Sequence, residues 1–449
     1  MEPLLMRKRA ANQTRGAKPP RVERRRGMRG IRDTRDDSEG SGANPIDFND
    51  VAFGEMFVLR ATADTSCRYK SRRMGVGVLR RGGSLHAAAI KLSRRCGRSN
   101  AGLTSIRGVV LGALLKSVSL TAYLTLRVLP AAIRAPMGIT YLLGRAASGI
   151  ANASPISHSE RLDLLSALHV AVSGEAHECV FSRIKNAAWA QTEPGEIRLL
   201  KSIDSVLAAF AQLDSEDRRA VSLCVATRIE AVQFDVRAFP GTHAGCVVAL
   251  RDMAELERYA YLKAGCVGEF WAKMAYADAP RPLRGEREKW IELGVRLGKA
   301  LQITRVLRDG ASDLGDGRCY FPRALLEQAR IGPHDLLLPD ASSRAWPILS
   351  ELVYAALAHY RSGLRHMLTI AHLSVHARLA CAGVIAIGLN TLLHLVESEA
   401  WLAAKHTSRL QRISVCSIVV SLAAVPSNPL LLRRAEGVIA RIEARLASG

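Results

Sequence analysis

The chain has 449 residues, of which 48% are hydrophobic and 5% aromatic, and it carries a formal net charge of +22. That length supports a large hydrophobic core and excludes a single small domain. The charge first suggests nucleic acid or an acidic membrane surface as a partner. Much of the positive excess lies before residue 100, however, so we expect no nucleic acid to bind the folded part.

Nine cysteines are widely spaced along the chain, and no Cys-x-x-Cys pair occurs among them. The odd number and the wide spacing indicate neither a disulfide framework nor a zinc site. Residues 1–30 lack the apolar stretch of a secretory signal. We therefore predict a reducing, cytoplasmic location, and we leave open whether the chain contacts a membrane peripherally.

Residues 1–102 are rich in arginine, glycine and acidic clusters and show almost no apolar periodicity. Such a composition predicts a disordered or poorly structured basic segment. Arg24–Arg26 within it could contact an anionic partner or form part of a solvated tail. Residues 103–449 have long apolar helical periods, and we assign them to one helical domain.

The helical part is predicted to be all-α, a single large helical bundle, because no block is rich enough in β-formers to suggest a sheet. Pro130 and Pro136 bracket the gap between the first two helices. The apolar run Leu379–Val396 approaches membrane-spanning length, but it contains Asn390 and His394, so we interpret it as a buried helix. The other expected helices are Arg161–Val172, capped by Ser157 with Glu160, a helix capped by Asp214 or Asp217, Arg251–Ala275, Glu286–Asp309, Trp346–Ile370, His376–Val396 and Ser408–Ala424.

Two aspartates at the end of the expected helix Glu286–Asp309 form the strongest candidate site. Asp309 and Asp313 are four residues apart, so on a helix both carboxylates share one face, about 5–6 Å apart. Carboxylate oxygens are ligands of Mg²⁺, and the flanking Arg308 and Arg318 could bind the phosphate oxygens that such a metal holds. On spacing alone, the alternative is a solvated helix end in which Asp and Arg pair locally.

Three blocks in order resemble the squalene/phytoene synthase family, the head-to-head trans-prenyltransferases. Tyr259–Gly268 resembles the family's Y-x-x-x-x-A-G-x-V-G helix. Val118–Pro130 and Tyr141–Arg145 resemble its opening S-R-x-F, R-x-L-P and Y-x-x-x-R segments. The family's second aspartate-rich motif, Q-x-x-N-x-x-R-D-x-x-x-D followed by G-R-x-Y-x-P, is matched by Gln302, Arg308, Asp309, Asp313, Gly317, Arg318, Tyr320 and Pro322.

The resemblance implies a helical fold of the isoprenoid synthase type. It also implies a prenyltransferase that joins two prenyl diphosphates head to head through a cyclopropyl intermediate, in squalene or carotenoid biosynthesis. The implied substrate is farnesyl or geranylgeranyl diphosphate, the implied cofactor is Mg²⁺, and use of NADPH is left open. Asp309 and Asp313 would be the metal ligands, and Tyr259 the catalytic residue near the cation. The implied substrate-binding residues are Arg145, Gln302, Arg308, Arg318 and Tyr320.

Five residues depart from the family pattern at positions expected to face the ligand. Ser148 and Asn152 stand where the first aspartate-rich motif has carboxylates, and serine is a poor substitute for a metal-bridging carboxylate. Leu120 and Ala122 replace an arginine and an aromatic residue, and Arg305 replaces an asparagine. These changes put turnover at risk. They support an alternative function, a catalytically impaired homologue that acts as a prenyl-diphosphate-binding or assembly scaffold.

Some residues near the Tyr259 block have more than one interpretation. Tyr259 itself could be a core aromatic with a satisfied hydroxyl. Asp235 could be an acidic pocket residue or could form a local salt bridge with Arg237 or another neighbour. Small side chains would let another backbone or a ligand come close at Ala264, Gly265 and Gly268.

Overall fold

The structure, a computed structural model, describes residues 106–129, 131–153, 155–174, 178–239, 246–278, 286–370, 375–402 and 428–448. All of these residues belong to one unit of the chain. The basic segment 1–102 and the expected helix Ser408–Ala424 lie outside the described residues. The domain boundary near residue 103 therefore stays a prediction.

Helices make up most of the described chain, which confirms the all-α class. The first half contains α4 (Ile106–Val118), α5 (Leu120–Val128), α6 (Ala131–Asn152), α7 (His158–Ser173), α8 (Glu178–Asn186), η1 (Ala187–Ala190), α9 (Pro194–Lys201), α10 (Ile203–Ala211) and α11 (Ser215–Ala238). The second half contains β1 (Val248–Leu250), α12 (Met253–Ala260), η2 (Tyr261–Gly265), α13 (Cys266–Asp278), α14 (Arg287–Gly315), β2 (Arg318–Pro322), α15 (Arg323–Gln328), η3 (Pro333–Leu337), α16 (Ala341–Arg344), α17 (Trp346–Thr369), α18 (Val375–Glu397) and α20 (Asn428–Ser448).

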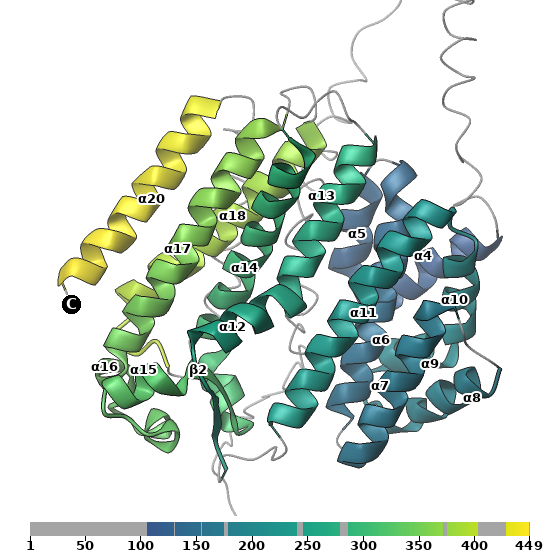
Figure 1. Cartoon of the computed structure of the whole chain (residues 1–449), viewed down its shortest axis with the longest axis horizontal. Coiled ribbons are helices and arrows are strands. Elements are labelled where there is room, and N and C mark those ends of the chain that lie inside the picture. The colour runs from purple at the N-terminus through teal and green to yellow at the C-terminus, as the bar shows by residue number, and fades with distance from the viewer. Residues whose placement is uncertain are drawn as a thin grey trace, which may run out of the picture. The chain divides into compact units, whose positions relative to one another are not determined.

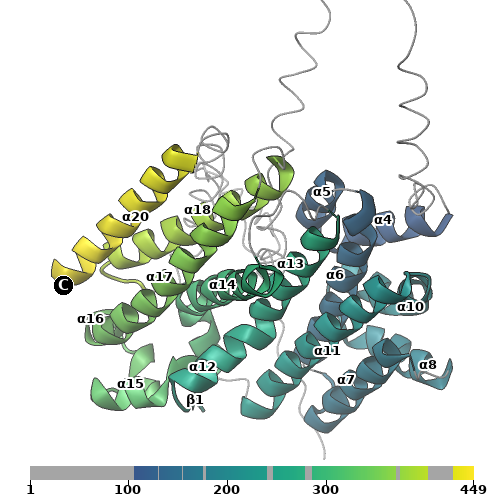
Figure 2. The ribbon, with the colours of Figure 1, turned by 45° about the horizontal axis from the view of Figure 1, so that its top comes forward.

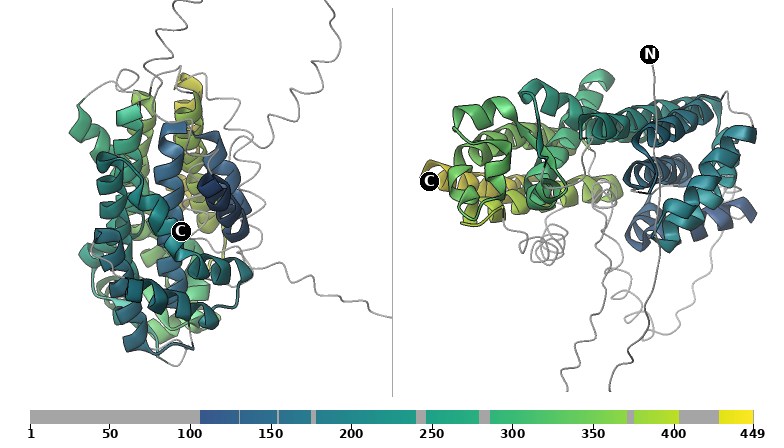
Figure 3. Two further views of the ribbon diagram at one scale, coloured as in Figure 1. Left: turned by 90° about the vertical axis from the view of Figure 1, so that its right-hand side faces the viewer. Right: turned by 90° about the horizontal axis from the view of Figure 1, so that it is seen from below.

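The long helices pack beside one another in a row that ends with the C-terminal helix α20 (Figures 1 and 2). Contacts run from α6 to α11, from α11 to α13, and from α13 to α14. They continue from α14 through α17 and α18 to α20. The helices α7 to α10 pack around α6 at the other end of the row (Figure 3). Helix α14 therefore has neighbours on both sides, and much of its surface is buried.

Small residues allow α13 and α14 to approach backbone to backbone. A side chain at Gly268 would collide with the carbonyl oxygen of Gly294 on α14, and one at Gly298 would collide with the carbonyl oxygen of Ala264. The close approach expected at Ala264, Gly265 and Gly268 is thus made by the backbone of α14.

The substitution Gly268→Ala should lower the free energy of unfolding by roughly 1–3 kcal/mol, because the added methyl group forces α13 away from α14. Urea denaturation of the variant and the wild type measures the difference. The control is Gly437→Ala in α20, where nothing lies within 4 Å of the added carbon. There the helix propensity of alanine should stabilise the protein by up to about 1 kcal/mol. Wild-type stability of Gly268→Ala would contradict this packing.

A short parallel pair of strands corrects the expectation that the chain has no sheet. Val248 of β1 pairs with Arg318 of β2, Ala249 pairs with Cys319, and the register shifts before Leu250 pairs with Pro322. Strands of three and five residues are too short to give a periodic signal in the sequence. The pair matters because it fixes β2 beside α12 and α14.

Several expected helices are confirmed, with their caps. Ser157 accepts a hydrogen bond from the Glu160 backbone N–H at 3.3 Å, and Asp214 accepts one from the Asp217 N–H at 2.9 Å. Each cap satisfies an N–H group that has no partner inside its helix. Helices α17 and α18 begin and end within one residue of the expected bounds.

Other boundaries were wrong. Helix α14 continues to Gly315, so both aspartates lie inside the helix rather than at its end. Pro136 lies inside α6, past its first turn, so it removes one backbone hydrogen bond of the helix and does not mark a gap between helices. The expected helix Arg251–Ala275 is divided into α12, a π-helical turn and α13. The C-terminal helix α20 was not predicted.

The apolar run Leu379–Val396 forms most of α18, and its residues from Cys381 onward are largely buried. This confirms the interpretation of the run as a core helix. Among the residues that the structure describes, no helix combines the length and the apolar character needed to cross a membrane.

Buried His366 of α17 makes the stability of the protein depend on pH. Its ring stacks on Trp290 of α14, with centroids 3.7 Å apart, and burial lowers the pKa of His366 from 6.5 to about 3. As the pH falls, His366 binds a proton in the unfolded chain before it does so in the folded protein. The contribution of neutral His366 to the free energy of unfolding is therefore complete above pH 6.5 and is lost as the pH falls toward 3. Between pH 8 and pH 5 we expect a loss of about 2 kcal/mol through this group.

The variant His366→Phe keeps the stack on Trp290 and removes the titration. Urea denaturation at pH 8 and at pH 5 should show that the free energy of unfolding of this variant lacks the decrease of about 2 kcal/mol expected for the wild type. A variant whose stability falls between pH 8 and pH 5 as much as that of the wild type would contradict the assignment.

Candidate active site

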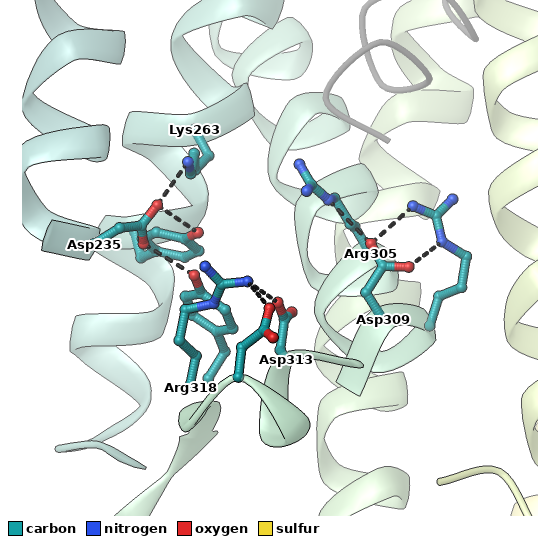
Figure 4. A network of polar contacts seen from close by, with 10 residues as sticks. Asp235, Lys263, Arg305, Asp309, Asp313 and Arg318 are labelled. Carbon is teal, nitrogen blue, oxygen red and sulfur yellow. Dashed lines mark hydrogen bonds and ion pairs between the residues drawn. The ribbon is translucent and has the colours of Figure 1, made fainter. Parts of the chain in front are cut away.

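The C-terminal half of α14 carries Asp309, which is held by two arginines of the same helix (Figure 4). Arg308 donates from Nε to Oδ1 at 2.8 Å and from Nη2 to Oδ2 at 3.2 Å. Arg305 donates from Nε to Oδ2 at 3.2 Å. Burial alone would raise the pKa of Asp309, but Arg308 and Arg305 outweigh it and hold this pKa below its usual value. Asp309 is therefore a charged carboxylate with both oxygens engaged.

Asp313, one turn further along α14, pairs with Arg318 of β2. The Arg318 Nη2 atom lies 3.3 Å from Asp313 Oδ1 and 2.7 Å from Asp316 Oδ2. Burial raises the pKa of Asp313 to about 6, although Arg318 and Arg305 act against this shift. The β1–β2 pair thus places the guanidinium group of Arg318 beside the carboxylate of Asp313.

A second cluster, shown beside the first in Figure 4, is centred on Asp235 of α11. Lys263 Nζ lies 2.7 Å from its Oδ2 atom, and Tyr320 donates to its Oδ1 atom at 3.1 Å. The Tyr259 hydroxyl is 3.5 Å from Oδ2. Asp235 therefore forms a salt bridge with another neighbour, Lys263, rather than with Arg237, and its role as a pocket residue stays a prediction.

The tyrosines of this cluster stack on each other. The ring centroids of Tyr259 and Tyr320 are 4.8 Å apart, with 22° between the ring planes. Lys263 Nζ lies 5.8 Å from the centroid of Tyr259, within the range of a cation–π contact. Burial, reinforced by Asp235, raises the pKa of both hydroxyls well above 10, so both remain protonated donors.

The helix that would carry the first aspartate-rich motif is arranged differently. Arg145 Nη2 lies 2.6 Å from Glu196 Oε1 of α9, and both side chains are largely buried. Ser148 donates to the Gly144 carbonyl of its own helix at 3.1 Å. Asn152 is exposed. The predicted contact between Arg145 and diphosphate stays a prediction, and the structure gives this arginine a carboxylate partner.

Most of the predicted site residues come together at the end of α14. The clusters around Asp309, Asp313 and Asp235 contain Tyr259, Arg308, Arg318 and Tyr320, while Gln302 is buried on the same helix. Among the departures from the family pattern, Leu120 is exposed and Ala122 is buried.

Two residues of this region were missed in the sequence. Lys263 stands among Leu262, Ala264 and Gly265, and a lysine in such an apolar stretch was a usable signal for a buried ion pair. Glu196 gave no signal, because its partner Arg145 is 51 residues away in the chain.

The family model described as "Squalene/phytoene synthase" matches residues 115–414, which is more than half of the chain. This chain belongs to the squalene/phytoene synthase family. Membership agrees with the helical fold and with the motif residues gathered around α14.

Relatives in this family carry several names. The chain is similar to presqualene diphosphate synthase of Zymomonas mobilis subsp. mobilis, with 29% identity over 279 residues, 62% of this chain and 80% of the relative. Phytoene synthase of Thermus thermophilus is 34% identical over 117 residues, 26% of this chain and 37% of the relative. Squalene synthase 1 of Arabidopsis thaliana is 22% identical over 285 residues, 62% of this chain and 63% of the relative.

Among solved structures, a complex of TcSQS with a ligand superposes with a TM-score of 0.54 and 16% identity. The match covers 76% of this chain and 99% of TcSQS. At this identity the likeness supports the fold alone.

Proteins of this family are typically metal-dependent. Magnesium needs oxygen ligands in a near-octahedral arrangement. Both oxygens of Asp309 accept from guanidinium groups, and Ser148 bonds to its own helix. The described residues contain no group of three or more His, Cys, Asp or Glu placed to hold a metal ion. The donor set as it stands does not fit magnesium, and Asp309 and Asp313 as metal ligands stay a prediction.

Proposed function

We propose that the chain is a head-to-head prenyltransferase that acts on prenyl diphosphates, farnesyl or geranylgeranyl diphosphate. The observation that carries this proposal is the stacked pair Tyr259–Tyr320 beside the basic end of α14. Guanidinium groups suit a diphosphate, and aromatic faces suit an allylic cation. A reaction that separates these two charges needs both features next to each other.

In this proposal Arg308 and Arg318 contact the diphosphate, and Gln302 is a polar residue of the pocket. The C–O bond to the diphosphate breaks, and its electron pair leaves with the diphosphate oxygen. The π faces of Tyr259 and Tyr320 then stabilise the allylic cation that remains. The double bond of the second prenyl diphosphate attacks this cation and forms a new C–C bond. The released diphosphate then accepts a proton, and the C–H electron pair closes a cyclopropyl ring that joins the two chains.

Incubation of the full-length protein with farnesyl or geranylgeranyl diphosphate tests the proposal, with and without Mg²⁺ and NADPH. We expect release of diphosphate and a product with two prenyl chains, identified by mass spectrometry. No product and no diphosphate release, under conditions in which a related synthase works, would refute it. Binding of prenyl diphosphate without product would instead favour the impaired homologue suggested by Ser148 and Asn152.

The variant Tyr259→Phe should lower kcat by roughly 10²-fold or more if its hydroxyl handles a proton, since a positioned proton-transfer group contributes at least that much. The phenylalanine keeps the stack on Tyr320, so circular dichroism should show an unchanged fold. The control is Tyr354→Phe, because Tyr354 is 45% exposed on α17. A kcat for Tyr259→Phe equal to that of the control would show that only the ring of Tyr259 matters.

A further inference from the structure

Lys263 is a buried lysine to which the proposed function assigns no role. Its side chain is 12% exposed, and its ammonium nitrogen lies 2.7 Å from Oδ2 of Asp235, whose side chain is 16% exposed. Burial lowers the pKa of Lys263, and Asp235 acts against that shift. A lysine is almost never buried unless it is paired, so this ammonium group depends on the Asp235 carboxylate.

An irregular turn of the backbone carries this lysine. Lys263 lies in the π-helical turn η2 between α12 and α13, where the Cys266 N–H donates to the Tyr261 carbonyl. Asp235 lies on α11, which packs against η2. Single π-helical turns inside helices are rare and occur frequently at functional sites. The ion pair therefore joins α11 to a part of the chain whose geometry departs from an ordinary helix.

Stability alone does not account for a buried pair of this kind. Both charges lose their hydration, so an apolar pair of similar volume is often as stable or more stable. A second lysine pair, Lys299 with Glu257, joins α14 to α12 at the same distance of 2.7 Å, and its side chains are 22% and 30% exposed. The more deeply buried pair is the one beside the stacked tyrosines.

The Asp235 carboxylate connects Lys263 to both tyrosines of the stack (Figure 4). Tyr320 donates to Oδ1 at 3.1 Å, and the Tyr259 hydroxyl lies 3.5 Å from Oδ2, the oxygen that Lys263 contacts. An ammonium group has donors and no acceptor, so Oδ2 must accept here, and the Tyr259 hydroxyl can only donate to it. Lys263 thus fixes the direction of the hydrogen bonds around Asp235.

We infer that Lys263 is a positioning residue, which acts through Asp235 to hold the hydroxyl groups and the rings of Tyr259 and Tyr320 in one orientation. The inference rests on the proposed function, in which the faces of these rings stabilise the allylic cation. Lys263 Nζ also lies 5.8 Å from the centroid of the Tyr259 ring, which is a second contact that holds this ring. Arg308 and Arg318 contact the diphosphate in that function, so Lys263 should affect the chemical step rather than substrate binding.

Kinetics of the full-length variant Lys263→Met with farnesyl or geranylgeranyl diphosphate test the inference. Methionine is of similar length and removes the positive charge. We expect kcat to fall by at least tenfold and KM to stay within about threefold of the wild type, because an interaction that acts in the transition state alone lowers kcat and kcat/KM together. The matched control is Lys299→Met, which breaks the pair with Glu257 and should keep kcat within about threefold. Equal values of kcat for the two variants would overturn the inference.

The double variant Lys263→Met with Asp235→Asn separates positioning from a structural role. It removes both buried charges, so urea denaturation should show that the stability lost in Lys263→Met is recovered. Its kcat should stay at least tenfold below that of the wild type, because the amide replaces one acceptor oxygen of Asp235 with a donor NH₂ group. A double variant that regains wild-type kcat together with its stability would overturn the inference.

Crystal structures of the wild type and of Lys263→Met supply a measurement that does not depend on activity. In the variant we expect Tyr259 and Tyr320 no longer both to donate to Asp235, and the stack of their rings to shift. Unchanged positions of both tyrosines would overturn the inference even if the chain is shown to be a prenyltransferase. A wild type that forms no product refutes the proposed function instead, and displaced tyrosines in Lys263→Met would then still support the positioning role.

Discussion

The substitution Asp309→Asn should lower the free energy of unfolding by roughly 3 kcal/mol and leave diphosphate binding intact. The Asp309 side chain is 12% exposed and that of Arg308 is 9% exposed. Removal of the carboxylate takes away the negative charge that accepts hydrogen bonds from both Arg308 and Arg305. Added diphosphate should restore stability, because the anion replaces that counter-charge and binds the folded state. Urea denaturation with and without inorganic diphosphate, in EDTA, measures both effects.

The control for Asp309→Asn is Glu292→Gln, which breaks the exposed pair with Arg296 on the same helix. That change should cost less than about 1 kcal/mol. If Asp309 were a metal ligand, its substitution would affect diphosphate binding rather than stability. Loss of diphosphate binding by Asp309→Asn in a parallel measurement with Mg²⁺, with stability like that of the control, would show that Asp309 acts through a metal ion.

The substitution Arg145→Met should also be strongly destabilising, by roughly 3 kcal/mol, because it leaves Glu196 as a buried carboxylate without its cation. The two side chains are 8% and 17% exposed. The double variant Arg145→Met with Glu196→Met should recover most of the loss, since an apolar pair of similar volume avoids the cost of burying a charge. Urea denaturation of the wild type, both single variants and the double variant completes the cycle.

A double variant that is no more stable than Arg145→Met would contradict a structural role for this pair. The control is Lys185→Met, which removes a pair with Asp204 in which the side chains are 37% and 46% exposed. It should cost less than about 1 kcal/mol. If Arg145 instead binds diphosphate, Arg145→Met would weaken diphosphate binding and leave stability like that of the control.

The fold was largely predictable, because apolar helical periodicity is a strong signal over long segments. Helices α17 and α18 show this, and Ser157 and Asp214 are recognisable caps. The β1–β2 pair was not predictable, since its strands join residues about seventy positions apart with three to five residues each. The π-helical turn was missed for a similar reason, because it inserts one residue into a pattern that otherwise reads as one helix.

The residues of the candidate site could be named from the sequence, but their ion-pair and hydrogen-bond partners could not. Of the residues of the motif from Gln302 to Pro322, Asp313 contacts Arg318, and Tyr320 donates to Asp235. Their roles in the site stay predictions. Spacing alone does not decide whether a carboxylate faces a metal or an arginine. That depends on Arg305, which was noted as a departure, and on Lys263, which was not considered. The pair of Lys263 with Asp235 joins two helices that only the folded chain brings together, whereas Arg305 and Asp309 pair within one helix.

The surroundings of Ser148 and Asn152 on α6 explain why the fold tolerates the loss of the first aspartate-rich motif. Ser148 satisfies its hydroxyl within its own helix, and Asn152 lies at the surface. Neither change leaves a buried polar group unpaired, so the bundle is not destabilised. In the proposed function, the positive charge for a diphosphate comes from the arginines of α14 and β2.

The most direct test of this account is a crystal structure of the full-length protein grown with Mg²⁺ and a prenyl thiodiphosphate. We expect guanidinium nitrogens of Arg308 and Arg318 within hydrogen-bond distance of the diphosphate oxygens, and Asp309 still bound to Arg305 and Arg308. A magnesium ion coordinated by Asp309 and the diphosphate, with Arg305 turned away from the carboxylate, would contradict the account.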